Sequence, residues 1–138
     1  MSEKILKVST FLIIVIAIIH IVALNFYLYW HFWWLDILMH FMGGFWISAF
    51  LFWILYFSRF FKFQPKSFLS LLSLVVFLNL LISLGWEIFE WKLGITFSME
   101  KYYWGDTFSD IFSSLAGGLI ALLLFYRGIF SESFGNYE

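Results

Sequence analysis

The chain has 138 residues, of which 63% are hydrophobic, 25% aromatic and 12% charged, with no cysteine and a formal net charge of -1. An ordinary globular domain carries about 25% charged residues, so a water-soluble core could not cover this much apolar surface, and lipid is the expected solvent. The lack of cysteine excludes disulfides and thiolate chemistry, and the near-neutral charge offers no basic surface for nucleic acid.

Four apolar segments are long enough to cross a bilayer, which takes about 20 residues in a helix. They lie at residues 9–29, 37–57, 67–90 and 107–126. Lys4 and Lys7 precede the first as they would precede a secretory signal, but its length and the lack of a small-residue cleavage site favour a retained helix. The sequence therefore predicts an all-α, polytopic membrane protein, a single domain over residues 1–138 built as a four-transmembrane-helix bundle.

Basic residues are divided unevenly between the two ends of such a bundle. With four helices, the two termini and the loop at residues 59–66 share one side, whereas Lys92 and Lys101 lie on the other. The first side holds Lys4, Lys7, Arg59, Lys62, Lys66 and Arg127. Because cytoplasmic loops carry the excess of Lys and Arg, we expect a multi-pass protein of the cell membrane with both termini in the cytoplasm.

Three pairs of ionisable residues are expected at the opposite end, near the outer interface. Each pair has helical spacing and projects from one helix face, so three faces can meet around one pocket. The pairs are Asp36 with His40, Glu87 with Glu90, and Asp106 with Asp110. An ionisable residue inside a membrane helix is a candidate for a functional site by default.

Such a pocket requires positive charge. Five carboxylates and one imidazole cannot all be ionised together in a poorly hydrated site, so a metal ion, shared protons or a cationic ligand is expected. Carboxylates with a histidine suit a divalent ion such as Zn, Mn, Mg or Ca. The predicted metal ligands are Asp36, His40, Glu87, Glu90, Asp106 and Asp110, and either Glu87 or Glu90 is the candidate catalytic base.

Structural roles stay open for some of these acids. Asp36 and Asp106 stand at expected helix starts, where an aspartate commonly caps backbone N–H groups and meets the favourable end of the helix dipole. Glu90 precedes Trp91 and Lys92 close to water, where a solvated surface charge would account for it.

Two further features of the spans have structural interpretations. His20 stands among Ile and Val in the first span, where a neutral histidine bonded to Asn25, Ser48 or a backbone carbonyl would be satisfied. The pairs Gly43-Gly44 and Gly117-Gly118 are expected to let the second and fourth spans approach closely.

Aromatic residues gather at the level of the acidic pairs, as an interfacial belt requires. They are Trp30, Trp33, Trp34, Trp86, Trp91, Tyr102, Tyr103 and Trp104.

The order of these motifs resembles a known family. Three motifs within residues 34–124 resemble the YjdF-type family of small bacterial inner-membrane proteins: Asp36-x-x-x-His40, Glu87-x-x-Glu90-Trp91 and Asp106-Thr107-x-x-Asp110. A more distant similarity is to VanZ-like proteins, whose spacing Asp110-x-x-x-Ser114-x-x-Gly117 matches, with Ser114 in place of Asn and Glu90 in place of Gln. The resemblance implies that the six positions form a site, and it names no reaction.

Three classes of function follow from the pocket. The first is a metal-dependent hydrolase or transferase that acts on a lipid or lipid-linked envelope substrate. The second is an ion- or proton-coupled transporter subunit, for which so small a chain would form a homo-oligomer. The third is a non-catalytic membrane scaffold. Membrane lipids are the expected partners in each.

Overall fold

The computed structural model describes residues 2–58, 60, 65, 67–94 and 103–134. These residues form helices and connecting turns, with no strand among them. The helices are α1 (Ser2–Asn25), α2 (Leu28–His31), α3 (Trp33–Tyr56), α4 (Phe68–Leu93) and α5 (Tyr103–Phe134). All except α2 are long and apolar enough to cross a membrane, which confirms the predicted all-α bundle of four membrane spans.

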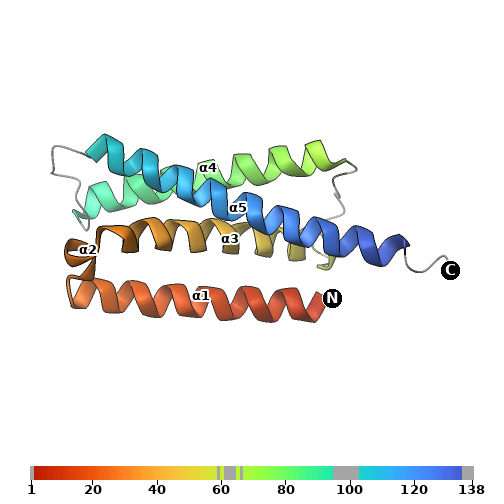
Figure 1. The fold of residues 1–138 in the computed structure, drawn as a ribbon, viewed down its shortest axis with the longest axis horizontal. Coiled ribbons are helices and arrows are strands. Elements are labelled where there is room, and N and C mark those ends of the chain that lie inside the picture. Colours follow the sequence, from red (N-terminus) through yellow and green to blue (C-terminus); the bar gives the residue numbers. More distant parts are fainter. Residues whose placement is uncertain (1, 59, 61–64, 66, 95–102, 135–138) are drawn as a thin grey trace.

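The long helices lie side by side, and α3 is the central one (Figure 1). It contacts α1, α2, α4 and α5, and α5 also contacts α4. By contrast, α1 packs against α2 and α3, and within the described part of the chain its backbone meets neither α4 nor α5. The start of α1 and the end of α5 lie at one end of the bundle, and α2 lies at the other (Figure 1).

The first span ends earlier than the sequence predicts. Its expected end is residue 29, whereas α1 ends at Asn25 because Tyr27 takes a left-handed conformation with φ 54° and ψ 34°. The chain then forms the separate helix α2. At its other end α1 begins at Ser2 instead of residue 9, since hydropathy marks where a helix leaves the hydrocarbon and not where its hydrogen bonding begins.

The same distinction explains the other bounds. The helix α3 begins at Trp33, before residue 37, and α5 extends beyond 107–126 in both directions. The bounds of α4 are sharp because Ser67 caps its start, accepting a hydrogen bond from the Ser70 N–H at 3.2 Å, and Gly94 ends it in the left-handed region.

Two apolar clusters and one polar layer hold the bundle together. One cluster joins α3, α4 and α5 around Phe52, and another joins α1, α2 and α3 around Tyr29. In the polar layer, the Asn79 amide donates to Ser48 Oγ at 3.0 Å and to the Val75 carbonyl at 2.9 Å. The Ser114 hydroxyl donates to Asn79 Oδ1 at 3.5 Å. Hydrogen bonds of this kind link membrane helices where no water can compete.

Glycines permit the close approach of α3 and α5. A Cβ on Gly44 would overlap the backbone carbonyl of Ser114, and a Cβ on Gly117 would overlap that of Phe41. A Cβ on Gly118 would press on the side chains of Asn79 and Ser48. The expected packing role is therefore confirmed for these three glycines and is wrong for Gly43, where an added Cβ would meet nothing within 4 Å.

This difference predicts opposite effects of alanine at two helical glycines. Gly44→Ala should destabilise the fold by at least about 1 kcal/mol, because the new methyl group forces α3 and α5 apart. Gly85→Ala should leave stability unchanged or slightly higher, since its Cβ points into open space and alanine favours a helix. Thermal unfolding in detergent measures both, and equal midpoints for the two variants would contradict the packing.

Candidate metal centre

The six residues expected to form a site come together at the end of the bundle opposite the start of α1. Asp36 and His40 lie in the first two turns of α3, Glu87 and Glu90 in the last two turns of α4, and Asp106 and Asp110 in the first two turns of α5. Five of the six are buried, and Asp106 is half-buried.

Their ligand atoms form three groups in which all atoms lie within 4.8 Å of one another. The groups are Asp36, His40 and Glu90; His40, Glu87 and Asp110; and Asp36, Asp106 and Asp110. Because Asp36, His40 and Asp110 each belong to two groups, the three groups form one continuous cluster. We call these six residues the acidic cluster; they offer enough donors for one divalent ion, and for a second that shares ligands with the first.

His40 lies at the centre of the acidic cluster. Its Nε2 is 3.8 Å from Asp36 Oδ1 and 3.7 Å from Glu87 Oε1, distances too long for hydrogen bonds. His40 is only 8% exposed, and Asp36 only 5%. The ring therefore faces carboxylates on two helices without bonding to either.

Four buried polar atoms of the cluster have no hydrogen-bond partner within the part of the chain that the structure describes. They are Asp36 Oδ2, His40 Nε2, Glu87 Oε1 and Asp110 Oδ1. A buried polar atom without a partner costs about 1–3 kcal/mol, more if charged, and native structures rarely leave one. Metal–ligand distances of roughly 2.0–2.5 Å put two ligands of one ion up to about 4–5 Å apart, so the separations around His40 fit a shared ion.

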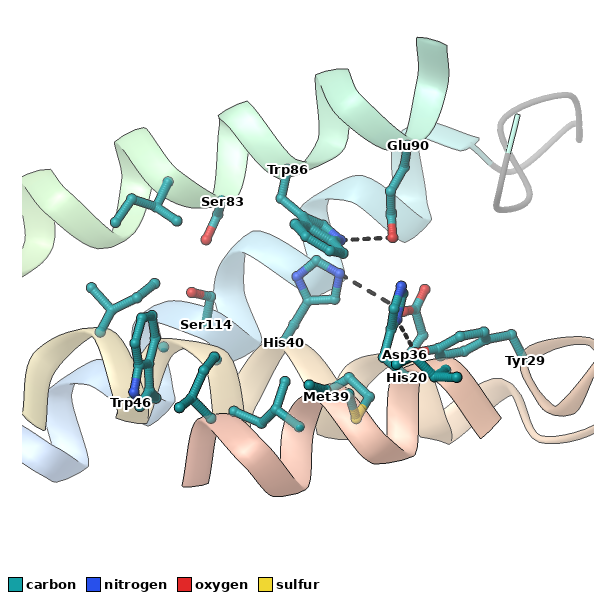
Figure 2. A pocket seen from close by; sticks show the side chains of 18 residues that line it. His20, Tyr29, Asp36, Met39, His40, Trp46, Ser83, Trp86, Glu90 and Ser114 are labelled. Carbon is teal, nitrogen blue, oxygen red and sulfur yellow. Dashed lines mark hydrogen bonds and ion pairs between the residues drawn. The ribbon is translucent and has the colours of Figure 1, made fainter. Parts of the chain in front are cut away.

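Hydrogen bonds from neighbouring residues orient two of the carboxylates. Thr107 Oγ1 donates to Glu87 Oε2 at 2.9 Å, which leaves Oε1 facing His40. Trp86 Nε1 donates to Glu90 Oε1 at 2.7 Å (Figure 2). Partners of this kind commonly fix metal ligands in place. The sequence prediction assigns neither Trp86 nor Thr107 a role as a hydrogen-bond donor to these carboxylates. A signal was present, since Trp86 stands four residues before Glu90 and Thr107 three before Asp110.

His20 and Tyr29 adjoin the cluster. The hydroxyl of Tyr29 lies 2.8 Å from His20 Nδ1, so the expected partners of His20 were wrong: the turn at Tyr27 brings α2 back over α1. Burial, and then the nearby Asp36 and Glu90, raise the pKa of Tyr29 above its usual value. The phenol therefore stays protonated at neutral pH and can donate to His20.

The fold distinguishes between the structural alternatives for the acids. Asp36 is the fourth residue of α3, whose N-cap is Phe32 without a side-chain cap, so capping does not explain Asp36. Asp106 is likewise the fourth residue of α5 and not its N-cap, although the helix dipole still favours a carboxylate in this first turn. Glu90 is buried, so the interpretation as a solvated surface charge is wrong.

Several tryptophans expected in the interfacial belt are exposed at this end of the bundle. They are Trp30, Trp33, Trp34, Trp91 and Trp104. Trp86 differs, because its indole also faces Glu90 and the His20 ring. Part of the predicted belt and of the basic residues lies outside the described residues, namely Tyr102, the side chain of Tyr103, Lys101 and most of the 59–66 loop. The orientation of the protein in the membrane stays a prediction.

The four spans define an integral membrane protein in contact with lipid. The chain belongs to the family described as predicted membrane protein (DUF2238), whose model matches residues 3–129. That membership is consistent with the YjdF-type resemblance, while the VanZ-like similarity stays a prediction. No curated protein and no solved structure matches the chain.

Removing one charge from the cluster should stabilise the metal-free protein. In the presence of a chelator, Asp110→Asn should raise the thermal unfolding midpoint, because the amide relieves repulsion among buried carboxylates. Added Mn²⁺ should then stabilise the native protein more than the variant. Glu3→Gln, at an exposed position on α1, is the control that should change neither value. A lower midpoint for Asp110→Asn in chelator would point to a purely structural role.

Proposed function

We propose that this protein is a metal-dependent hydrolase or transferase that acts on a lipid or lipid-linked envelope substrate. The observation that carries the proposal is the set of four buried, unpartnered polar atoms on three helices, gathered around His40. A scaffold could join its helices with paired groups, as the Asn79 layer does, and would have no use for unpaired ones.

A divalent ion in the acidic cluster would act as a Lewis acid toward a phosphoryl or carbonyl oxygen and would activate water. Asp36, His40 and Asp110 would be the ligands shared between groups, and Glu87 directs its free oxygen toward His40. Glu90 also lines the cavity beside the cluster, where a substrate would bind, so Glu90 is the better candidate for the general base.

The place of the cluster suits a substrate in one leaflet. It lies at the end of the bundle away from the start of α1, among exposed tryptophans. With both termini in the cytoplasm, as the distribution of basic residues predicts, this end faces the outer leaflet. Lipid-linked envelope precursors would present their head groups at that level.

The polar layer argues against the transporter alternative. A through-path would require polar groups that continue from the cluster to the other end. Instead, Ser48, Asn79 and Ser114 bond to one another, and the apolar cluster around Phe52 lies beyond them.

Elemental analysis tests whether the cluster holds metal. After modest chelation, the detergent-purified native protein should carry at least about one divalent ion per chain, and a Glu87→Gln, Asp110→Asn double variant should carry almost none. Circular dichroism and gel filtration should show the same fold for both, and Glu3→Gln should retain the native metal content. Absence of metal from the native protein would contradict the proposal.

Activity tests the role of Glu90. With metal bound, the native protein reconstituted in vesicles should release the head group of a phosphate-ester lipid. Glu90→Gln should slow this release by about 10²–10⁴-fold, the usual contribution of a general base, while most of the metal stays bound. Unchanged turnover in Glu90→Gln would exclude it as the base, and no turnover with any envelope lipid would favour a binding role.

A further inference from the structure

A cavity of about 350 Å³ lies directly beside the acidic cluster. Asp36, His40 and Glu90 are part of its wall (Figure 2). Many of the other lining residues are aliphatic, such as Ile16 and Ile47, beside aromatic side chains and the hydroxyls of Ser83 and Ser114. Its walls come from all five helices, and its volume falls in the range of about 300–1,000 Å³ that is typical of small-molecule sites. The cavity is thus mostly apolar, with the carboxylates and the imidazole of the acidic cluster on part of its wall.

The exposed lining residues indicate that the cavity opens sideways, between α1 and α4. The described backbones of these two helices do not meet, and the contact of the His20 and Trp86 rings, 5.5 Å between centroids, bridges them beside the cluster. Lining residues of both helices are also exposed, among them Ile21 of α1 to 59% and Ile82 of α4 to 45%. Both lie within membrane spans, so the opening faces lipid.

Gly43 keeps part of this cavity empty. It lines the cavity, and an added Cβ would meet nothing within 4 Å. Helix packing therefore does not require glycine at this position, unlike at Gly44. A larger side chain at residue 43 would instead occupy the cavity.

We propose that this cavity holds one hydrocarbon tail of a membrane lipid, which enters between α1 and α4 and places its head group at the acidic cluster. The aliphatic walls and the opening within the span match a tail, and the polar part of the wall matches a head group. The identification of the head-group site rests on the proposed function, whereas binding of the tail can be measured without turnover.

Photo-crosslinking tests the tail site directly. The probe is phosphatidic acid with a diazirine in its acyl chain, mixed into phosphatidylcholine vesicles that contain the full chain. After irradiation, mass spectrometry should find adducts on the wall residues Ile16 and Ile47. Adducts on the exposed residues Phe77 and Phe112 report the bulk lipid and serve as the internal reference.

Two glycine variants provide the matched comparison. Gly43→Leu should reduce labelling of Ile16 and Ile47 at least fivefold relative to Phe77 and Phe112, and Gly43→Ala should reduce it less. Gly85→Leu should leave the labelling unchanged, because Gly85 is exposed, has the same open space around its Cβ, and does not line the cavity. Equal labelling in Gly43→Leu and Gly85→Leu would overturn the inference.

Metal content separates this inference from the proposed function. Gly43→Leu should keep the native metal content, since residue 43 contributes no ligand. Cavity labelling that depends on Gly43 in a protein without metal would support the tail site and contradict the metal centre. Bound metal together with wall labelling no higher than the lipid background would support the metal centre and contradict the tail site.

Discussion

Burial of unpaired polar atoms is the constraint on which this structure depends. In a membrane each unsatisfied group costs several kcal/mol, and water cannot compensate in the hydrocarbon region. His40 and the carboxylates of Asp36, Glu87 and Asp110 are nevertheless buried with atoms unpaired. A cation shared among them would convert this cost into binding energy, because metal ligation would satisfy the same atoms and neutralise their charge.

The helix packing serves this arrangement. Gly44 and Gly117 let α3 and α5 approach closely, and in the polar layer Asn79 of α4 forms hydrogen bonds with Ser48 of α3 and Ser114 of α5. These three helices carry all six residues of the acidic cluster. Among the described residues, the backbone of α1 approaches that of α3 but not those of α4 and α5, and the cavity lies beside α4 in the space this leaves. The proposed chemistry on a lipid head group would use this polar site together with the apolar cavity beside it.

Hydropathy and helical spacing predict much of this from the sequence. The four spans follow from apolar length, and the convergence of Asp36, Glu87 and Asp110 follows from an antiparallel topology with paired positions on each helix face. The turn at Tyr27 does not follow, because a left-handed conformation at a residue other than glycine has no clear local signal. The His20–Tyr29 contact depends on that turn and could not be predicted either.

The role of Gly43 also lies beyond sequence reasoning. Adjacent glycines look equivalent in the sequence, yet successive helical residues point about 100° apart, so Gly44 contacts α5 while Gly43 faces the cavity. Which of the two faces a neighbour depends on the rotation of α3, which only tertiary packing sets. The burial of Glu90 also depends on tertiary packing. From the sequence, its position near the end of α4 suggests exposure to water.

Electron paramagnetic resonance of the Mn²⁺-loaded protein is the measurement that tests the central claim most directly. If His40 and the carboxylates share a cation, the pulsed spectrum should show hyperfine coupling to one imidazole nitrogen, and His40→Gln should remove that coupling while the fold is retained. A spectrum identical to that of hydrated Mn²⁺, or a nitrogen coupling that persists in His40→Gln, would contradict the assignment of this cluster as the metal centre.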